Sequence, residues 1–146
     1  MSLPRGCSIS GIFNIFAEKT ILDIHKQLEY WIRTGEDDIQ SSQILFANKK
    51  ILHGLFFCHL AIEKIIKANL VKKTGKIPPK IHNLTFLLSS AGIELSPEEK
   101  ELTGILMIYQ LEGRYPEYYP STPKLSDAKK YLKQTEKLFQ CLKNKL

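Results

Sequence analysis

The chain has 146 residues, of which 43% are hydrophobic and 25% are charged, and its formal net charge is +6. This length is typical of one domain that buries a core without disulfides or metal ions. No apolar run approaches the roughly 20 residues that span a bilayer, and no signal-peptide pattern is present, so we expect a cytoplasmic protein with no membrane association. Cys7, Cys58 and Cys141 are odd in number and widely spaced, which favours free, buried thiols over a disulfide or zinc framework.

Positive charge is concentrated in two segments. Residues 60–80 hold six lysines and one acid, and residues 124–146 hold seven lysines and two acids, so each segment carries a net charge of +5. Two basic segments on one small domain suit RNA or an acidic protein partner. The alternative is that these lysines only keep helix surfaces solvated.

The first third of the chain predicts an arm followed by helix. Pro4, Gly6 and Gly11 interrupt residues 1–19, so we expect an irregular arm that packs on the bundle or crosses to a second copy. Residues 20–31 have helical spacing of apolar residues, and residues 36–49 continue it after an acidic first turn. We expect Gly35 to kink or divide this helix.

The central segment predicts a helix from about Lys50 to Gly75 that is apolar over most of its circumference, as in the middle helix of a small bundle. Its polar residues His59, Glu63 and Lys67 follow one another at i, i+4 spacing, so they share one face. This face is either a solvated strip or a functional surface.

The last third predicts three more helices. Asn83 opens a short helix, Ser96 and Glu99 form a capping box for a helix that runs to about Glu112, and Ser126 begins the last helix. Residues 114–123 form a loop with three prolines and three tyrosines. No segment reads as a strand, so the expected fold is an all-α bundle of about five helices.

Several kinds of active site lack support in the sequence. Neither the phosphate-binding loop of nucleoside triphosphatases nor the glycine-rich loop of dinucleotide-binding folds is present. The four histidines do not form the H-E-x-x-H pair of zinc enzymes, and we expect neither a metal nor a cofactor.

Three motifs occur in a fixed order: HLAIEKIIKA at residues 59–68, HNLTFLL at 82–88 and RYP at 114–116. Together they resemble the HEPN family (higher eukaryotes and prokaryotes nucleotide-binding domain) over residues 31–142. The resemblance implies a single domain built as an up-and-down helical bundle, here residues 31–146 preceded by an arm and leading helix at 1–30. It also implies that the chain forms a homodimer.

Members of the family are of two kinds. Some are metal-independent ribonucleases in which an arginine stabilises phosphate charge and a histidine several residues later moves protons. Others are non-catalytic partners, often of a minimal nucleotidyltransferase in toxin–antitoxin pairs. Arg114 matches the motif arginine, but Tyr119, Pro120 and Ser121 stand where the histidine belongs.

We therefore interpret the chain as a non-catalytic module that binds RNA, a nucleotide or a partner protein such as a nucleotidyltransferase. The alternative is an RNA endonuclease with an altered motif, for which the candidate catalytic residues are Arg114, Tyr119 and His82. The resemblance assigns ligand binding to Arg114, Tyr115, His59, Glu63, Lys67 and His82. Structural roles are also open: Arg114 bonding the last carbonyls of a helix, and His82 bonding the backbone at the next helix start.

Aromatic residues near the last two helices predict how two copies meet. Tyrosine is enriched at protein interfaces. We expect a two-fold dimer in which one exposed patch meets itself, formed by Tyr109, Tyr118, Tyr119 and Tyr131.

Overall fold

The computed structural model describes the backbone of residues 9–146 and the side chains of residues 23–146. This part of the chain contains helices and no strand, which confirms the all-α class. The elements are α1 (Ile9–Ala47), α2 (Ile51–Thr74), α3 (Leu84–Ala91), α4 (Pro97–Ile108), the short 3₁₀ helix η1 (Pro116–Tyr118) and α5 (Leu125–Asn144).

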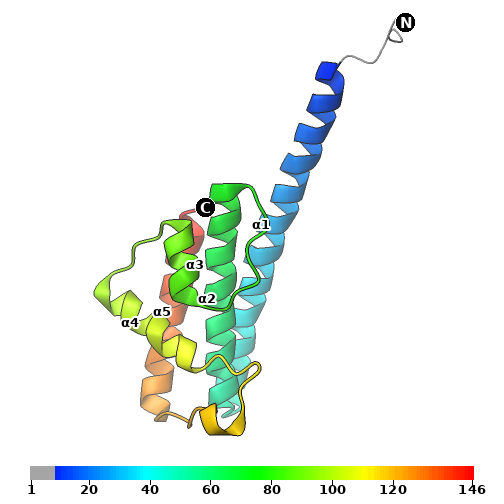
Figure 1. Cartoon of the computed structure of the whole chain (residues 1–146). Helices are drawn as coiled ribbons and strands as arrows, with labels where there is room; N and C mark the ends of the chain where they lie inside the picture. Colours follow the sequence, from blue (N-terminus) through cyan, green and yellow to red (C-terminus); the bar gives the residue numbers. More distant parts are fainter. Residues whose placement is uncertain (1–8) are drawn as a thin grey trace, which may run out of the picture.

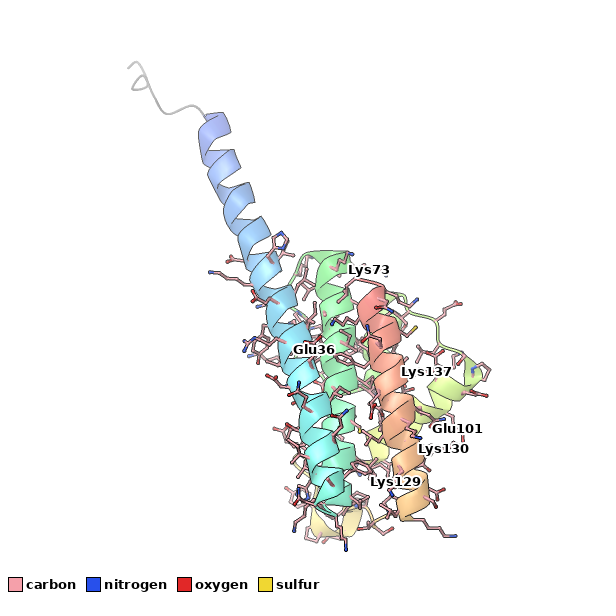
Figure 2. The ribbon with its side chains drawn as sticks, turned by 180° about the vertical axis from the view of Figure 1, so that it is seen from behind. Glu36, Lys73, Glu101, Lys129, Lys130 and Lys137 are labelled. Atoms are coloured by element: carbon pink, nitrogen blue, oxygen red, sulfur yellow. The ribbon has the colours of Figure 1, made fainter. Side chains whose placement is uncertain are left out.

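The long helix α1 forms an antiparallel pair with α2, and its N-terminal part extends beyond the end of the bundle (Figures 1 and 2). A tight turn joins the two helices, with Lys49 at a φ of 61°. The predicted irregular arm is wrong from Ile9 onward, because those residues continue the helix; residues 1–8 lie outside the described part. The predicted division of the helix at Gly35 is also wrong, since α1 passes through it, and the alternative of a kink there stays a prediction.

Two glycines bring helices close together. A Cβ on Gly35 would lie 2.9 Å from the Phe139 ring, and one on Gly54 would lie 2.5 Å from the Phe46 ring. Each glycine therefore accepts an aromatic side chain of another helix against its backbone. Tight packing of α1 against α5 and α2 explains why Gly35 does not interrupt the helix.

Helix α2 is the centre of the bundle, as its sequence predicts. α1, α3, α4 and α5 all pack on it, and α5 runs parallel to it (Figure 1). Its apolar residues are buried all round its circumference, which is why no single stripe is visible in its sequence. The fully buried apolar side chains of α2 are Leu55, Cys58, Ala61, Ile62, Ile65, Ile66 and Ala68.

Local chemistry sets most helix ends. Gly75 closes α2 in the left-handed conformation, Asn83 caps α3, and Ser96 and Glu99 form the predicted capping box of α4. α4 ends at Ile108, before the predicted Glu112. Its last carbonyls are bonded by Arg114 in place of further helical N–H groups.

The structure also tests the expectations about membrane-spanning segments and about the cysteines. In the described part of the chain no helix is long and apolar enough to cross a membrane. Cys58 and Cys141 are both free thiols, but only Cys58 is buried; the expectation of a buried thiol is wrong for Cys141, which faces solvent on α5, and Cys7 lies outside the described residues.

Candidate functional site

Four polar side chains meet between α2 and the segment that leads into α3, three of them buried and one at the surface. They are His59, Glu63 and Lys67 of α2, with His82 from the connection, and we call them the buried quartet. Relative exposures of 0%, 4% and 5% for His59, Glu63 and Lys67 rule out a solvated strip. The polar face of α2 therefore points into the protein.

The Glu63 carboxylate is the centre of the buried quartet. Its Oε1 accepts a hydrogen bond from Lys67 Nζ at 2.7 Å, and both its oxygens accept from His82 Nδ1, at 3.0 and 3.2 Å. Lys67 Nζ also lies 5.3 Å from the centre of the Trp31 ring, a cation–π contact across to α1. One buried anion is thus satisfied by a buried cation and an imidazole.

The His59 ring is a neutral imidazole that carries its proton on Nε2. His59 Nε2 lies 3.1 Å from the His82 carbonyl oxygen, which only accepts, so Nε2 carries the proton. Nδ1 then presents a lone pair 3.7 Å from Glu63 Oε2. Burial lowers the pKa of His59 to about 4, so this ring is neutral at pH 7.

The His82 side chain is half exposed, unlike the rest of the quartet. Its Nδ1–H points at a buried carboxylate, which fixes the orientation of the ring. The structural role expected for His82, bonding the backbone at the start of the next helix, is wrong: Asn83 provides that cap and the ring turns to Glu63. A carboxylate-held imidazole with an accessible face is the arrangement that serves proton transfer in many enzymes.

A second ion pair, absent from the sequence interpretation, lies next to the quartet. Lys64 Nζ is 2.6 Å from Asp38 Oδ2, joining α2 to α1. Burial raises the pKa of Asp38, against the lowering effect of the Lys64 hydrogen bond. Trp31 and Asp38 stand on α1, and no local spacing in the sequence connects them to residues on α2.

Arg114 lies in the connection between α4 and α5, where its guanidinium binds backbone. Nε donates to Gln110 O at 2.8 Å, Nη1 to Tyr118 O at 3.1 Å, and Nη2 to the carbonyls of Met107 and Ile108 at 3.1 and 3.2 Å. The side chain thus ends α4 and holds the following loop. This is the structural role considered for Arg114 from the sequence.

The loop held by Arg114, residues 114–119, displays aromatic rings, and we call it the tyrosine loop. Tyr115 and Tyr118 are 72% and 69% exposed, and Tyr119 is 44% exposed. The predicted aromatic patch is wrong for Tyr109, which is buried at the end of α4, and Tyr131 is only partly exposed. Exposed rings are therefore confined to the loop on this part of the surface.

Exposed lysines lie along α5, which begins at Leu125, six residues after the end of the tyrosine loop. Exposed side chains at Lys129, Lys130, Lys133 and Lys137 project from the helix, and Figure 2 shows three of them along its length. The basic segment at residues 60–80 presents less charge than its composition indicates, because Lys67 is buried and Lys64 is paired with Asp38. Lys72, Lys73, Lys76 and Lys80 of that segment are nevertheless exposed, so both basic segments present accessible cations.

The structure brings some predicted site residues together and leaves others apart. His59, Glu63, Lys67 and His82 form one cluster; Arg114, Tyr115 and Tyr119 form another, in the tyrosine loop. No hydrogen bond or ion pair joins the two clusters among the residues described. In the same part of the chain no three His, Cys, Asp or Glu side chains are grouped to hold a metal ion.

The protein is thus an all-α bundle with two polar clusters. One lies on the buried polar face of the central helix, and the other forms where α4 ends at an arginine. The model of the HEPN domain matches residues 28–145, and the chain belongs to that family. A solved structure, the crystal structure of TT1696 from Thermus thermophilus, has the same fold: the TM-score is 0.69 and the identity 17%, over 82% of this chain and 98% of that one. No curated protein sequence matches the chain significantly.

Proposed function

We propose that this protein is a non-catalytic RNA-binding module that holds single-stranded RNA on the tyrosine loop and the neighbouring lysines of α5. The observation that carries the proposal is the set of hydrogen bonds made by the Arg114 guanidinium. Three of its nitrogens donate to four backbone carbonyls, so the guanidinium is committed to the fold while three tyrosines beside it are exposed.

The chemistry of the surface matches a single strand. Unstacked bases stack on aromatic side chains, and Tyr115 and Tyr118 offer the two most exposed rings of the loop. Lys129 to Lys137 extend for about eight residues of helix, about 12 Å at about 1.5 Å per residue, so they can follow the phosphates of one strand. Tyr119 stands at a position where the family's ribonucleases carry their histidine, so the loop lacks the imidazole that moves protons in them.

The proposal is tested by fluorescence anisotropy of a labelled single-stranded RNA. Tyr115→Ala and Tyr118→Ala each remove a stacking ring, worth about 1–3 kcal/mol, so each weakens binding about 5- to 150-fold. Phe86→Ala removes a half-exposed ring on α3 and leaves binding unchanged. Equal effects of all three variants would contradict the proposed surface.

Salt dependence tests the lysines separately. Each phosphate contact contributes about −0.7 to the slope of log K against log salt for a single strand. Lys129→Gln and Lys133→Gln therefore each make the slope shallower by about 0.7, while Lys26→Gln on α1 does not. Arg114→Ala weakens binding through the loop that it holds, without unfolding the bundle.

A second candidate function has one observation in its favour. The His82 ring, held by buried Glu63 and half exposed, is placed to move protons even though the family's histidine position is Tyr119. His59 is excluded from this role by complete burial. Metal-independent cleavage of RNA that disappears in His82→Asn would establish an altered ribonuclease in place of the binding module.

The proposal includes a homodimer and a cytoplasmic protein without a cofactor. Tyr119, the last residue of the loop, and Leu125, the first of α5, are 44% and 50% exposed and offer apolar surface to a second copy, while Tyr115 and Tyr118 remain for RNA. A protein that binds no RNA would point to a protein partner, such as the minimal nucleotidyltransferases that accompany some members of the family.

A further inference from the structure

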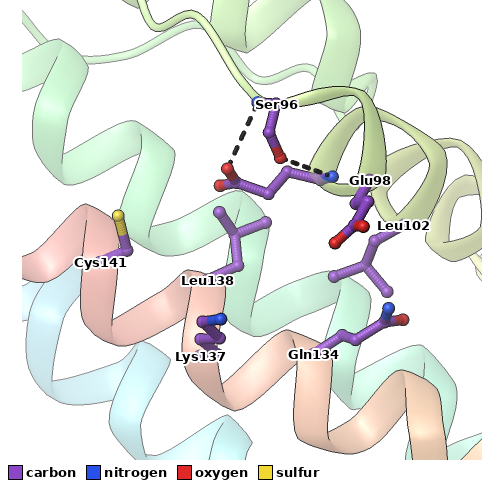
Figure 3. A pocket seen from close by; sticks show the side chains of 8 residues that line it. Ser96, Glu98, Leu102, Gln134, Lys137, Leu138 and Cys141 are labelled. Atoms are coloured by element: carbon purple, nitrogen blue, oxygen red, sulfur yellow. Dashed lines mark hydrogen bonds between the residues drawn. The ribbon is translucent and has the colours of Figure 1, made fainter.

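A cavity of about 300 Å³ lies between α4 and α5, and its lining shares no residue with the buried quartet or the tyrosine loop (Figure 3). The residues that matter are Glu98 and Leu102 of α4 with Gln134, Lys137, Leu138 and Cys141 of α5. This volume is at the lower end of the range for small-molecule pockets.

Helical spacing places these side chains on facing surfaces. Glu98 and Leu102 are four residues apart on α4, and the α5 residues recur at intervals of three or four, so each set occupies one face. Leu102 and Leu138 are each only 2% exposed and form the apolar floor. Figure 3 shows both leucines between the polar side chains of the two helices.

The polar groups around this floor are of opposite charge and are available. Glu98 and Lys137 are both exposed, and neither forms an ion pair with another side chain of the described residues. Ser96 and Glu99, which also line the cavity, are occupied by each other in the capping box. One free carboxylate and one free ammonium group therefore border an apolar surface.

We propose that this cavity binds a small zwitterion with an aliphatic side chain, the chemistry of a free branched-chain α-amino acid. The ligand ammonium pairs with Glu98, and its carboxylate pairs with Lys137 and accepts from the Gln134 amide. Its side chain packs on the aliphatic stem of Lys137 and on the small exposed edges of Leu102 and Leu138. Such a ligand satisfies both free charges of the lining and its apolar floor at once.

The same lining argues against a nucleotide here. Glu98 and Glu99 contribute two carboxylates against the single ammonium of Lys137, so a phosphate group would meet repulsion. The cavity has only Lys137 in common with the proposed RNA surface, so failure of either proposal leaves the other standing.

Alkylation of Cys141, at the rim of the cavity, measures ligand binding directly. Iodoacetamide alkylates its exposed thiol, and L-leucine at millimolar concentration slows that reaction with a saturable dependence, measured by mass spectrometry of the Cys141 peptide. Cys58 is an internal control: burial raises the pKa of its thiol to about 12, so it stays unmodified while the protein is folded.

Matched variants test the two charged contacts. Glu98→Gln and Lys137→Met each weaken the protection by L-leucine about two- to fivefold, as expected for an exposed ion pair. Glu101→Gln and Lys100→Met, at exposed positions of α4 outside the lining, leave it unchanged. Circular dichroism verifies that all four variants stay folded.

Analogues that lack one charge test the zwitterion. 4-Methylpentanoate has no ammonium and 3-methylbutylamine has no carboxylate, so each protects Cys141 less than L-leucine at equal concentration. Equal protection by all three, or no protection by L-leucine, would overturn the proposal.

Discussion

The Glu63 carboxylate is 4% exposed and has two partners, Lys67 and His82. The free-energy cost of burying its charge is offset by both. Burying a charge is costly, and the cost is offset only while the partners remain in place. The cation–π contact of Lys67 with Trp31 extends this dependence to α1. The quartet thereby links α2 to two neighbouring segments through one anion.

Removing this anion should destabilise the fold strongly. Glu63→Ala leaves Lys67 buried without its partner, and breaking a buried pair costs about 3–5 kcal/mol. Urea unfolding measures the loss, and Glu101→Ala at an exposed position of α4 serves as the control, with a change close to zero. Similar small losses in both variants would mean that the quartet does not stabilise the bundle.

His59 should make stability depend on pH. Its pKa falls from the ordinary 6.5 to about 4 on folding because of burial. Between these values the unfolded chain binds more protons, so stability is lost as the pH falls from about 6.5 to about 4, by up to about 1.4 kcal/mol per pH unit. Urea unfolding across this range should show a shallower dependence in His59→Gln than in wild type.

The contradicting outcome for His59 is an identical pH dependence in the two proteins. Burial raises the pKa of Asp38 above its ordinary value, which acts in the opposite direction. The difference between wild type and His59→Gln therefore isolates the histidine, because Asp38 is common to both.

The sequence predicted which residues of the quartet share a face, but not the direction of that face. Helical spacing aligns His59, Glu63 and Lys67 in any isolated helix. α2 is apolar all round, so no polar side marks the solvent, and burial is decided by α1 and by His82, 19 residues beyond Glu63. The direction of the polar face is therefore set by tertiary packing and not by the sequence of α2 alone.

At the level of helices, the predictable features were those with a local cause. Gly75, Asn83 and Ser96 end or begin helices through their own backbone or side-chain chemistry. Gly35 was predicted to kink or divide α1 because a glycine is unfavourable inside a helix, yet α1 continues through it and the Phe139 ring packs against it. A long-range contact overrode a local preference.

Two glycines with different surroundings provide a matched test of this packing. Gly54→Ala places a methyl group 2.5 Å from the Phe46 ring and should cost about 1–3 kcal/mol, which exceeds its gain in helix propensity. Gly104→Ala, on α4 with no atom within 4 Å, should stabilise by about 0.5–1 kcal/mol. Thermal or urea unfolding measures the sign of the stability change in each variant. A stabilising Gly54→Ala would refute the close approach of α1 and α2.

For the whole molecule, the order of three short motifs predicted the fold, and the family match over residues 28–145 confirmed it. The candidate site could not be predicted in the same way. Arg114 carries the motif arginine in sequence, but its side chain is bound to carbonyls, and only the structure shows where its donors point. Motif spacing specifies backbone positions and leaves side-chain partners open.

Assembly is the next prediction at this scale. Light scattering at micromolar protein should give a mass near twice the 16.8 kDa of one chain. Tyr119→Asp places a charge on the proposed apolar surface beside Leu125 and should lower the mass toward that of one chain, while Phe86→Asp on α3 should not. A wild-type protein of monomeric mass would contradict the dimer.

The central claim is that the protein binds RNA and does not cut it. The most direct measurement incubates an end-labelled single-stranded RNA with wild-type protein and a metal chelator, then compares native and denaturing gels of the same sample. We expect a slowly migrating complex on the native gel and intact RNA on the denaturing gel. Fragments that form with wild type and vanish with His82→Asn would contradict it.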